Sequence, residues 1–161
     1  MIEKNIITLA AEYFERAYKL HSDGKLENAI LAYRASIRIY PSAKAYTCLG
    51  KVYSLQGKFD LAIEKCKKAI ELEPESANAY HDIGTYLISM GREKDAIYWF
   101  EKAIELPNNE SNCYSYYNLG KIYEKEGDWL KALRHFNKAI AIDGNYEPAQ
   151  NAIIKLSTLL N

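Results

Sequence analysis

A glycine recurs at nearly constant spacing along this 161-residue chain, and this period constrains the fold more than any other feature. The stretch "CLGKVYSLQGKFDLAIEKCKKAI" at 48–70 is nearly repeated as "NLGKIYEKEGDWLKALRHFNKAI" at 118–140. Successive intervals of 33, 34 and 36 residues separate Gly24, Gly57, Gly91 and Gly127. Each of these glycines lies between two apolar-periodic stretches, so each is predicted to mark a turn between two helices.

Small side chains recur in register with these turns. Three glycines precede them in the later copies: Gly50, Gly84 and Gly120. Four alanines follow them at a constant distance of five residues: Ala29, Ala62, Ala96 and Ala132. Small residues let packed helices approach closely, and a period of this length is typical of a stacked helical solenoid. The chain is therefore predicted to be all-α, with helix-turn-helix copies at about 10–42, 43–76, 77–112 and 113–146.

Two copies carry a recognisable residue pattern. In the copy at 113–146 it consists of Tyr116, Leu119, Gly120, Tyr123, Ala132, Phe136 and Ala139. The copy at 43–76 carries Tyr46, Leu49, Gly50, Tyr53, Ala62, Ala69 and Pro74, with Cys66 in the aromatic position. This pattern resembles the tetratricopeptide repeat (TPR) family over residues 10–146. The resemblance implies a right-handed superhelical solenoid of four TPR units that forms a single domain over residues 1–161.

Both ends of the stack are predicted to need a cover, because each helix pair leaves one apolar face open. Residues 147–160 are predicted to form a C-terminal capping helix, with Pro148 in its first turn. Its expected buried stripe is Ala149, Ala152, Ile153, Leu156 and Leu160. At the other end, a stripe made of Ile2, Ile6, Leu9 and Tyr13 either packs on the first repeat or contacts a partner or a second copy.

Bulk composition excludes several classes of function. Twenty-one Lys plus Arg balance 21 Asp plus Glu, so no basic excess suggests nucleic-acid binding. No apolar run approaches a membrane span, so no membrane insertion is expected. The charged start, MIEKNIITLA, lacks a secretory pattern, and three cysteines without C-x-x-C spacing favour neither disulfides nor zinc. A cytoplasmic location is therefore predicted.

Catalytic chemistry has little support in the sequence. The three histidines are scattered, and no nucleotide-binding or nucleophile motif occurs. Cys66 occupies a position that is aromatic in the other copies, which favours a buried, inert thiol. We therefore expect no catalytic residue, no metal site and no cofactor, and an unrecognised enzyme remains only a distant alternative.

The resemblance implies that the first helices of the repeats line a concave groove. Aligned positions beside the packing residues give these predicted peptide-binding residues: Phe14, Tyr18, Lys44, Thr47, Lys51, Asn78, His81, Thr85, Tyr114, Tyr117 and Lys121. Asn151 and Lys155 would extend the groove onto the cap. Aromatic rings, amides and lysines suit an extended or helical peptide. The competing interpretation is that these are ordinary solvated residues.

A second predicted contact surface lies on the second helices. Tyr98 and Trp99 occupy positions that are charged or histidine in other copies, which indicates either a convex contact, including weak self-association, or packing against neighbouring helices. The longer loop at 106–112 could reshape the groove. Binding of a chaperone's terminal carboxylate is rejected, because the expected cationic clamp is missing and Asp82 would repel the ligand.

Together these features predict a non-enzymatic adaptor or scaffold that binds a protein or peptide partner. The alternative within the same class is a small chaperone for a secreted or assembling protein. Because the recurring residues serve packing, recognition is expected to depend on the positions where the copies differ.

Overall fold

The computed structural model describes residues 2–106 and 112–160, with side chains described from Lys4 onward, and every element in these ranges is an α-helix. The helices are α1 (Ile2–Ser22), α2 (Leu26–Ile39), α3 (Ala43–Leu55), α4 (Phe59–Leu72), α5 (Ala77–Ser89), α6 (Glu93–Glu105), α7 (Asn112–Lys125), α8 (Trp129–Ile142) and α9 (Glu147–Leu160). The predicted all-α helical repeat is confirmed.

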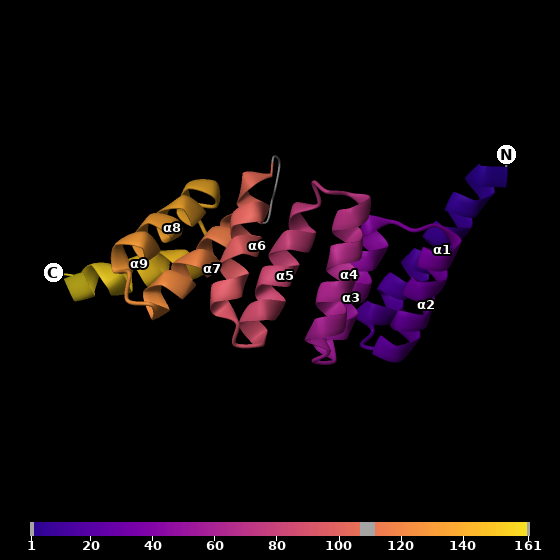
Figure 1. Ribbon diagram of the computed structural model, residues 1–161, viewed down its shortest axis with the longest axis horizontal. Coiled ribbons are helices and arrows are strands. Elements are labelled where there is room, and N and C mark those ends of the chain that lie inside the picture. The colour runs from indigo at the N-terminus through magenta and orange to yellow at the C-terminus, as the bar shows by residue number, and fades with distance from the viewer. Residues whose placement is uncertain (1, 107–111, 161) are drawn as a thin grey trace.

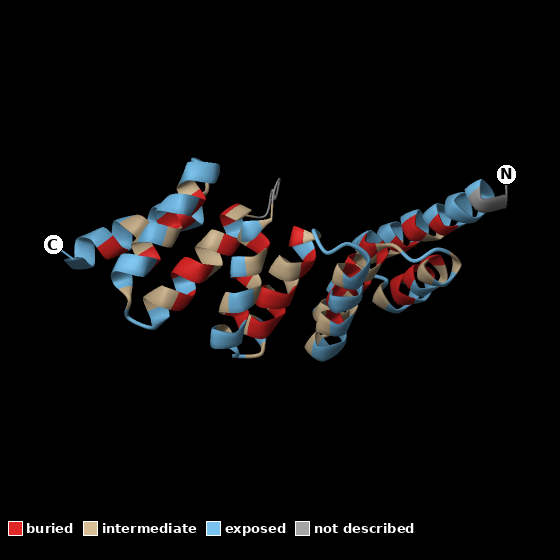
Figure 2. Cartoon of the chain, turned by 45° about the horizontal axis from the view of Figure 1, so that its top comes forward, coloured by how far each residue is buried: buried red, intermediate tan, exposed pale blue. Residues whose placement is uncertain are grey.

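Consecutive helices form antiparallel pairs that stack in chain order (Figure 1). Within each pair, α1 packs on α2, α3 on α4, α5 on α6 and α7 on α8, and each pair also contacts the next. The N- and C-terminal ends therefore lie at opposite ends of an elongated stack. Buried residues lie where helices face their neighbours, while exposed residues cover the outer sides (Figure 2).

The turns within the pairs depend on glycine, as predicted. Gly57 has φ of +72°, a left-handed conformation that side chains other than glycine rarely adopt. Its N–H donates to Ser54 O at 2.9 Å, and the N–H of Lys58 donates to Tyr53 O at 3.0 Å. These two bonds close the last turn of α3 and start the chain back toward α4.

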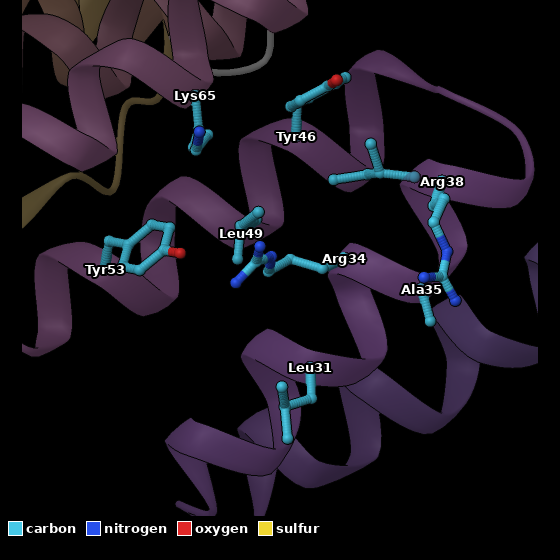
Figure 3. Close-up of a pocket in the computed structure, with 9 residues that line it drawn as sticks. Leu31, Arg34, Ala35, Arg38, Tyr46, Leu49, Tyr53 and Lys65 are labelled. Carbon is cyan, nitrogen blue, oxygen red and sulfur yellow. The ribbon is translucent and has the colours of Figure 1, made fainter.

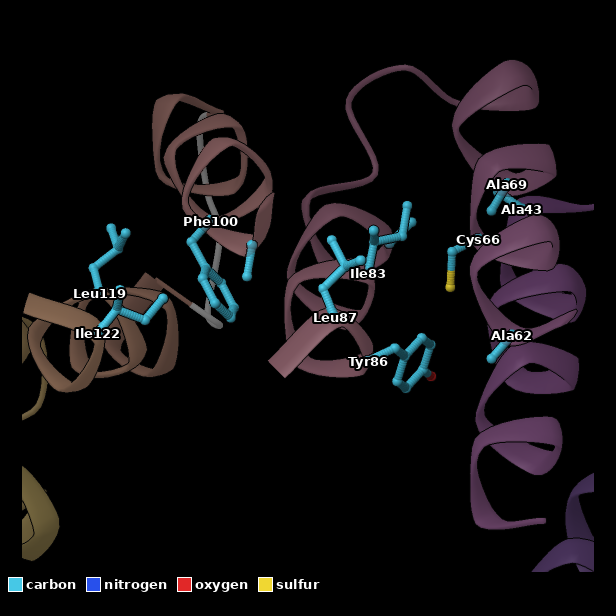
Figure 4. Close-up of a cluster of buried hydrophobic side chains, with 12 residues drawn as sticks. Ala43, Ala62, Cys66, Ala69, Ile83, Tyr86, Leu87, Phe100, Leu119 and Ile122 are labelled. Atoms are coloured by element: carbon cyan, nitrogen blue, oxygen red, sulfur yellow. The ribbon is translucent and has the colours of Figure 1, made fainter. Parts of the chain in front are cut away.

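The helical glycines allow a close approach between the two helices of a pair. A Cβ atom at Gly84 would lie 2.7 Å from the Phe100 ring, and one at Gly120 would lie 2.5 Å from the Phe136 ring. Phe100 and Phe136 are fully buried, and Cys66 is buried at the same position of α4. Figure 4 shows Phe100 and Cys66 between the helices of the central cluster. The prediction of a buried core position for Cys66 is confirmed.

The two ends of the stack differ from each other. The cap α9 buries Ala149, Ala152 and Leu156 as predicted, but Leu160 is exposed, which corrects the predicted stripe. At the N-terminus, the first turns of α1 project beyond its partner α2 (Figure 1). Ile6 is 40% exposed and Leu9 45% exposed, so packing on the first repeat is wrong for these two residues.

Candidate functional site

The predicted peptide-binding residues all lie on the first helices of the pairs, namely α1, α3, α5 and α7. We call their common surface the first-helix face. It comprises Phe14, Tyr18, Lys44, Thr47, Lys51, Asn78, His81, Thr85, Tyr114, Tyr117 and Lys121, together with neighbours that contact them. The structure brings several of these residues into contact across successive helices.

At the N-terminal end of the first-helix face, two predicted residues are buried. Phe14 is 9% exposed and packs edge-on against Tyr33, with the ring centroids 5.6 Å apart. Thr47 is also buried, and its hydroxyl donates to Ala43 O at 2.9 Å. These two side chains therefore form the buried base of the face. Tyr18 is 55% exposed, and Lys44 Nζ lies 4.9 Å from the Phe14 ring centroid.

An ion pair joins α3 and α5 in the middle of the face. Lys51 Nζ lies 3.6 Å from Asp82 Oδ2, and the carboxylate is largely buried. Burial raises the pKa of Asp82 to about 6, although Lys51 opposes this shift by favouring the charged form. From the sequence, Asp82 was expected only to repel an anionic ligand, and the repeat pattern gave no signal that it pairs with Lys51 on the neighbouring α3.

His81 connects α5 to α7 beside that ion pair. Its Nδ1 lies 2.8 Å from Ser115 Oγ, and its Nε2 lies 3.4 Å from Thr85 Oγ1. The Thr85 hydroxyl donates to His81 O at 3.1 Å, so it can only accept from the ring. This arrangement favours a proton on Nε2 and donation from Ser115 to Nδ1. Burial, with a smaller contribution from Lys51, lowers the pKa of His81 to about 4, so the ring is neutral at pH 7.

Aromatic rings cover the C-terminal end of the face. Tyr146, in the segment before α9, stands edge-on to both Tyr114 and Tyr117, with centroid distances of 5.4 and 5.3 Å. Tyr114 also lies 6.3 Å from His81, and Tyr117 lies 5.7 Å from Phe136. The alignment missed Tyr146 because it lies at the end of the fourth copy and not on a first helix.

The last part of the face connects α7 to the cap. Glu124 accepts hydrogen bonds from Lys121 and from Lys155, the latter at 2.8 Å. These bonds lower the pKa of the Glu124 carboxyl below its usual range. Asn151 is exposed on α9, and Asn78 is exposed on α5. Contacts between side chains thus run along the face from α1 to α9.

The second predicted surface is only partly exposed. Tyr98 is 55% exposed, as expected for a contact residue. Trp99 is half-buried instead: its ring lies 6.0 Å from Tyr80, and Lys67 Nζ lies 5.9 Å from the Trp99 ring centroid. This packing matches the alternative that the sequence left open for Trp99. The predicted role of the 106–112 loop concerns residues 107–111, which lie outside the described residues.

Reactive chemistry is sparse on the described parts of the chain. Within residues 2–106 and 112–160, no group of three His, Cys, Asp or Glu side chains is arranged to hold a metal ion. Burial raises the pKa of the Cys48, Cys66 and Cys113 thiols, which leaves them protonated at neutral pH. Across the same ranges, no helix has the length and apolar character needed to cross a membrane.

Comparison with known proteins agrees with this architecture. Two tetratricopeptide repeat models match residues 41–109 and 113–146. The mitochondrial import receptor subunit TOM70 of Rattus norvegicus is 28% identical over 130 residues, covering 79% of this chain but only 21% of the receptor. The chain thus spans about a fifth of the length of that relative.

Solved structures extend the similarity to most of the fold. The crystal structure of MamA is 30% identical with a TM-score of 0.75, covering 87% of this chain and 81% of MamA. PilF of Pseudomonas aeruginosa has a TM-score of 0.86 at 20% identity, covering 94% of this chain and 69% of PilF, which shows a likeness of fold alone. With repeat models matching most of the stack and MamA similar across it, the chain belongs to the tetratricopeptide repeat family.

Proposed function

We propose that this chain is a non-catalytic protein-interaction scaffold whose first-helix face binds an extended peptide segment of a partner protein. The observation that carries the proposal is the string of contacts that links this face from α1 to α9. Such a string holds side chains in fixed positions along several stacked helices. A peptide lying across them would meet a preorganised surface, which reduces the entropic cost of binding.

The chemistry of the face changes along its length. Its C-terminal end offers the half-exposed rings of Tyr114 and Tyr117, which supply contact area with little conformational entropy to lose. Its middle offers Lys51, whose charge is partly balanced by Asp82. A segment with an apolar or aromatic residue at one end and an acidic residue two repeats away would match this order.

A peptide selection followed by titration tests the proposal. Peptides selected from a random display library on the immobilised chain would be titrated by isothermal calorimetry against the wild type and a Tyr117→Ala, Lys51→Glu double variant. We expect the double variant to bind at least about tenfold more weakly, since it removes a ring and reverses a charge. The matched control is Arg134→Glu, which changes an exposed residue on α8.

Two outcomes would contradict this function. If the double variant keeps its thermal unfolding transition and binds the selected peptides within about twofold of the wild type, the first-helix face is not the binding surface. Because Lys51→Glu also disturbs Asp82, Tyr114→Ala serves as a second variant that leaves the ion pair intact. Turnover of a small-molecule substrate by the purified chain would overturn the non-catalytic assignment.

A further inference from the structure

A cavity of about 700 Å³ lies between α2, α3 and α4, and its lining includes none of the residues of the first-helix face. Figure 3 shows its lining, with the Arg34 side chain reaching from α2 toward α3. The lining residues are Leu31, Arg34, Ala35, Ile37, Arg38, Tyr46, Leu49, Tyr53 and Lys65. We call this cavity the first-junction pocket, because it lies where the second helix of the first pair meets the second pair.

The equivalent place in the next repeat is filled by the chain itself. There Trp99 of α6 occupies the position of Lys65, and its ring lies 6.0 Å from that of Tyr80, the equivalent of Tyr46. The cavity that remains between α4, α5 and α6 has a volume of about 310 Å³. An aromatic ring thus takes up space that stays open at the first junction.

The third junction is filled in the same manner. His135 of α8 occupies the equivalent position and lies between two tyrosines of α7. Its ring is stacked on Tyr123 at 5.2 Å and lies 6.0 Å from Tyr116. At the first junction, Tyr46 and Tyr53 have no such ring between them, because Lys65 extends to Glu64 Oε1 at 2.7 Å instead. A ring thus fills this position at the second and third junctions, whereas the same position is open at the first junction.

The charge of this pocket also differs from that of its equivalents. Arg34 and Arg38 lie one turn apart on α2, and both are exposed. Neither forms an ion pair with any other residue in the described part of the chain. The same positions hold Lys67 and Glu71 on α4, and two glutamates on α6. The two arginines make the first-junction pocket cationic, while Lys65 is paired with Glu64 and the later junctions are mixed or acidic.

We propose that the first-junction pocket binds an acidic segment of a partner protein that inserts an aromatic side chain beside Tyr46 and Tyr53. The ring would take the place that Trp99 and His135 take in the other junctions. Carboxylates on the flanking residues would pair with Arg34 and Arg38, whose planar guanidinium groups suit bidentate contacts. This site is separate from the first-helix face and could operate whether or not that face binds a peptide.

A peptide fits this pocket better than a nucleic acid does. Only three cations line it, and the chain has no net positive charge, whereas nucleic-acid binding needs an extended basic surface. Its volume lies within the range of about 300–1,000 Å³ that holds single ligand groups. Apolar walls formed by Leu31, Ile37 and Leu49 favour a ring over a bare phosphate.

Fluorescence anisotropy with a defined probe tests this proposal. The probe is a labelled short peptide with one tryptophan flanked on both sides by aspartate and glutamate, and its counterpart carries alanine for tryptophan. We expect the wild type to bind the tryptophan probe at least about tenfold more tightly than the alanine probe. The Arg34→Glu, Arg38→Glu double variant should lose at least about tenfold in affinity, while Arg134→Glu on α8 should not change it.

A pair of substitutions at one position separates filling from charge. Lys65→Trp reproduces the residue of the second junction and should close the pocket, with a loss of at least about tenfold in affinity. Lys65→Ala removes the same charge but leaves the space open, so it should lose no more than about threefold. Equal affinities for these two variants would overturn the assignment of the pocket.

Other outcomes have equally definite meanings. If the wild type binds both probes equally, or if heparin or a single-stranded oligonucleotide displaces the probe as well as unlabelled peptide does, the site is only a cationic patch and the proposal fails. The Tyr117→Ala, Lys51→Glu double variant should bind the probe normally. Its failure to do so would place the probe on the first-helix face and overturn the assignment of the first-junction pocket.

Discussion

The second helices α4, α6 and α8 are equivalent elements that differ at two adjacent positions. The pair is Lys65–Cys66 in α4, Trp99–Phe100 in α6 and His135–Phe136 in α8. The second residue of each pair faces the helical glycine of its own repeat, and the first faces the junction with the preceding repeat. Rings fill both positions in α6 and α8, and neither position in α4.

This difference shows that the repeat backbone does not require full aromatic packing at every junction. An added Cβ at Gly120 would lie 2.5 Å from the Phe136 ring, whereas at Gly50 it would lie 3.1 Å from Ala62 O and 3.3 Å from the Cys66 sulfur. Outside that contact, the junction opens into the first-junction pocket. The region near α4 thus combines an open pocket with accessible cations, whereas the region near α8 is closed by rings.

The largest expected effect comes from Gly120→Ala. Its Cβ would lie 2.5 Å from the buried Phe136 ring, and overpacking of this kind outweighs the gain in helix propensity. We expect the free energy of unfolding to fall by about 3 kcal/mol, measured by urea denaturation with circular dichroism. Gly50→Ala is the matched control and should cost less, about 1 kcal/mol, because its nearest contacts are Ala62 O at 3.1 Å and the Cys66 sulfur at 3.3 Å. Equal losses would contradict the difference in packing.

The second-largest effect is expected from opening the second junction, which Trp99 fills. Trp99→Lys gives α6 the residue of α4, removes the contact with Tyr80 and leaves a larger cavity. We expect a loss of about 2 kcal/mol in the free energy of unfolding, less than for a fully buried tryptophan because Trp99 is half-exposed. Tyr98→Lys on the same helix serves as the control. If both variants lose the same free energy, Trp99 does not fill the junction.

Asp82, whose charge acts on the Cys66 thiol, provides a pH-dependent test of the region near α4. Its pKa is raised from 3.8 to about 6, so the folded state binds the proton more tightly than the unfolded state does. The stabilising contribution of protonated Asp82 is therefore present in full below about pH 4 and is lost as the pH rises through 6. Asp82→Asn should raise the free energy of unfolding at pH 7 by about 1–2 kcal/mol, after the lost Lys51 pair is considered.

The measurement for Asp82→Asn is the difference in unfolding free energy between the variant and the wild type at pH 4, 5, 6 and 7. The comparison with the wild type is needed because the lowered pKa of His81 also makes the free energy of unfolding depend on pH. The contribution of neutral His81 is lost in the opposite direction, as the pH falls from 6.5 toward 4. The gain should grow with pH and vanish near pH 4. A constant gain across this range would exclude a raised pKa as its cause.

The smallest expected effect is a stabilisation by Lys65→Trp. The new ring should pack beside Tyr46 and Tyr53 and raise the free energy of unfolding by about 1 kcal/mol. Chemical denaturation measures this change, and Lys65→Ala should not reproduce it. A loss of stability would mean that the first-junction pocket is not shaped for a ring.

Sequence periodicity was sufficient to predict the stack of helix pairs because the relevant contacts are local and repeated. A turn glycine such as Gly57 is dictated by its positive φ, and a helical glycine such as Gly120 by the close approach of the Phe136 ring on the paired helix. The same register placed the candidate residues on one helix of each pair. Cys66 could be assigned to the core for the same reason.

Tertiary structure decided which of those positions remain at the surface. Phe14 and Thr47 are buried, and Tyr146 joins the first-helix face from outside the aligned positions. These outcomes depend on the size and direction of side chains on neighbouring helices, which a repeat alignment treats as equivalent. The first-junction pocket follows from the same cause, because Lys65 leaves open a space that larger rings fill elsewhere. Sequence determined the scaffold through backbone geometry, and packing between unlike side chains determined its accessible surfaces.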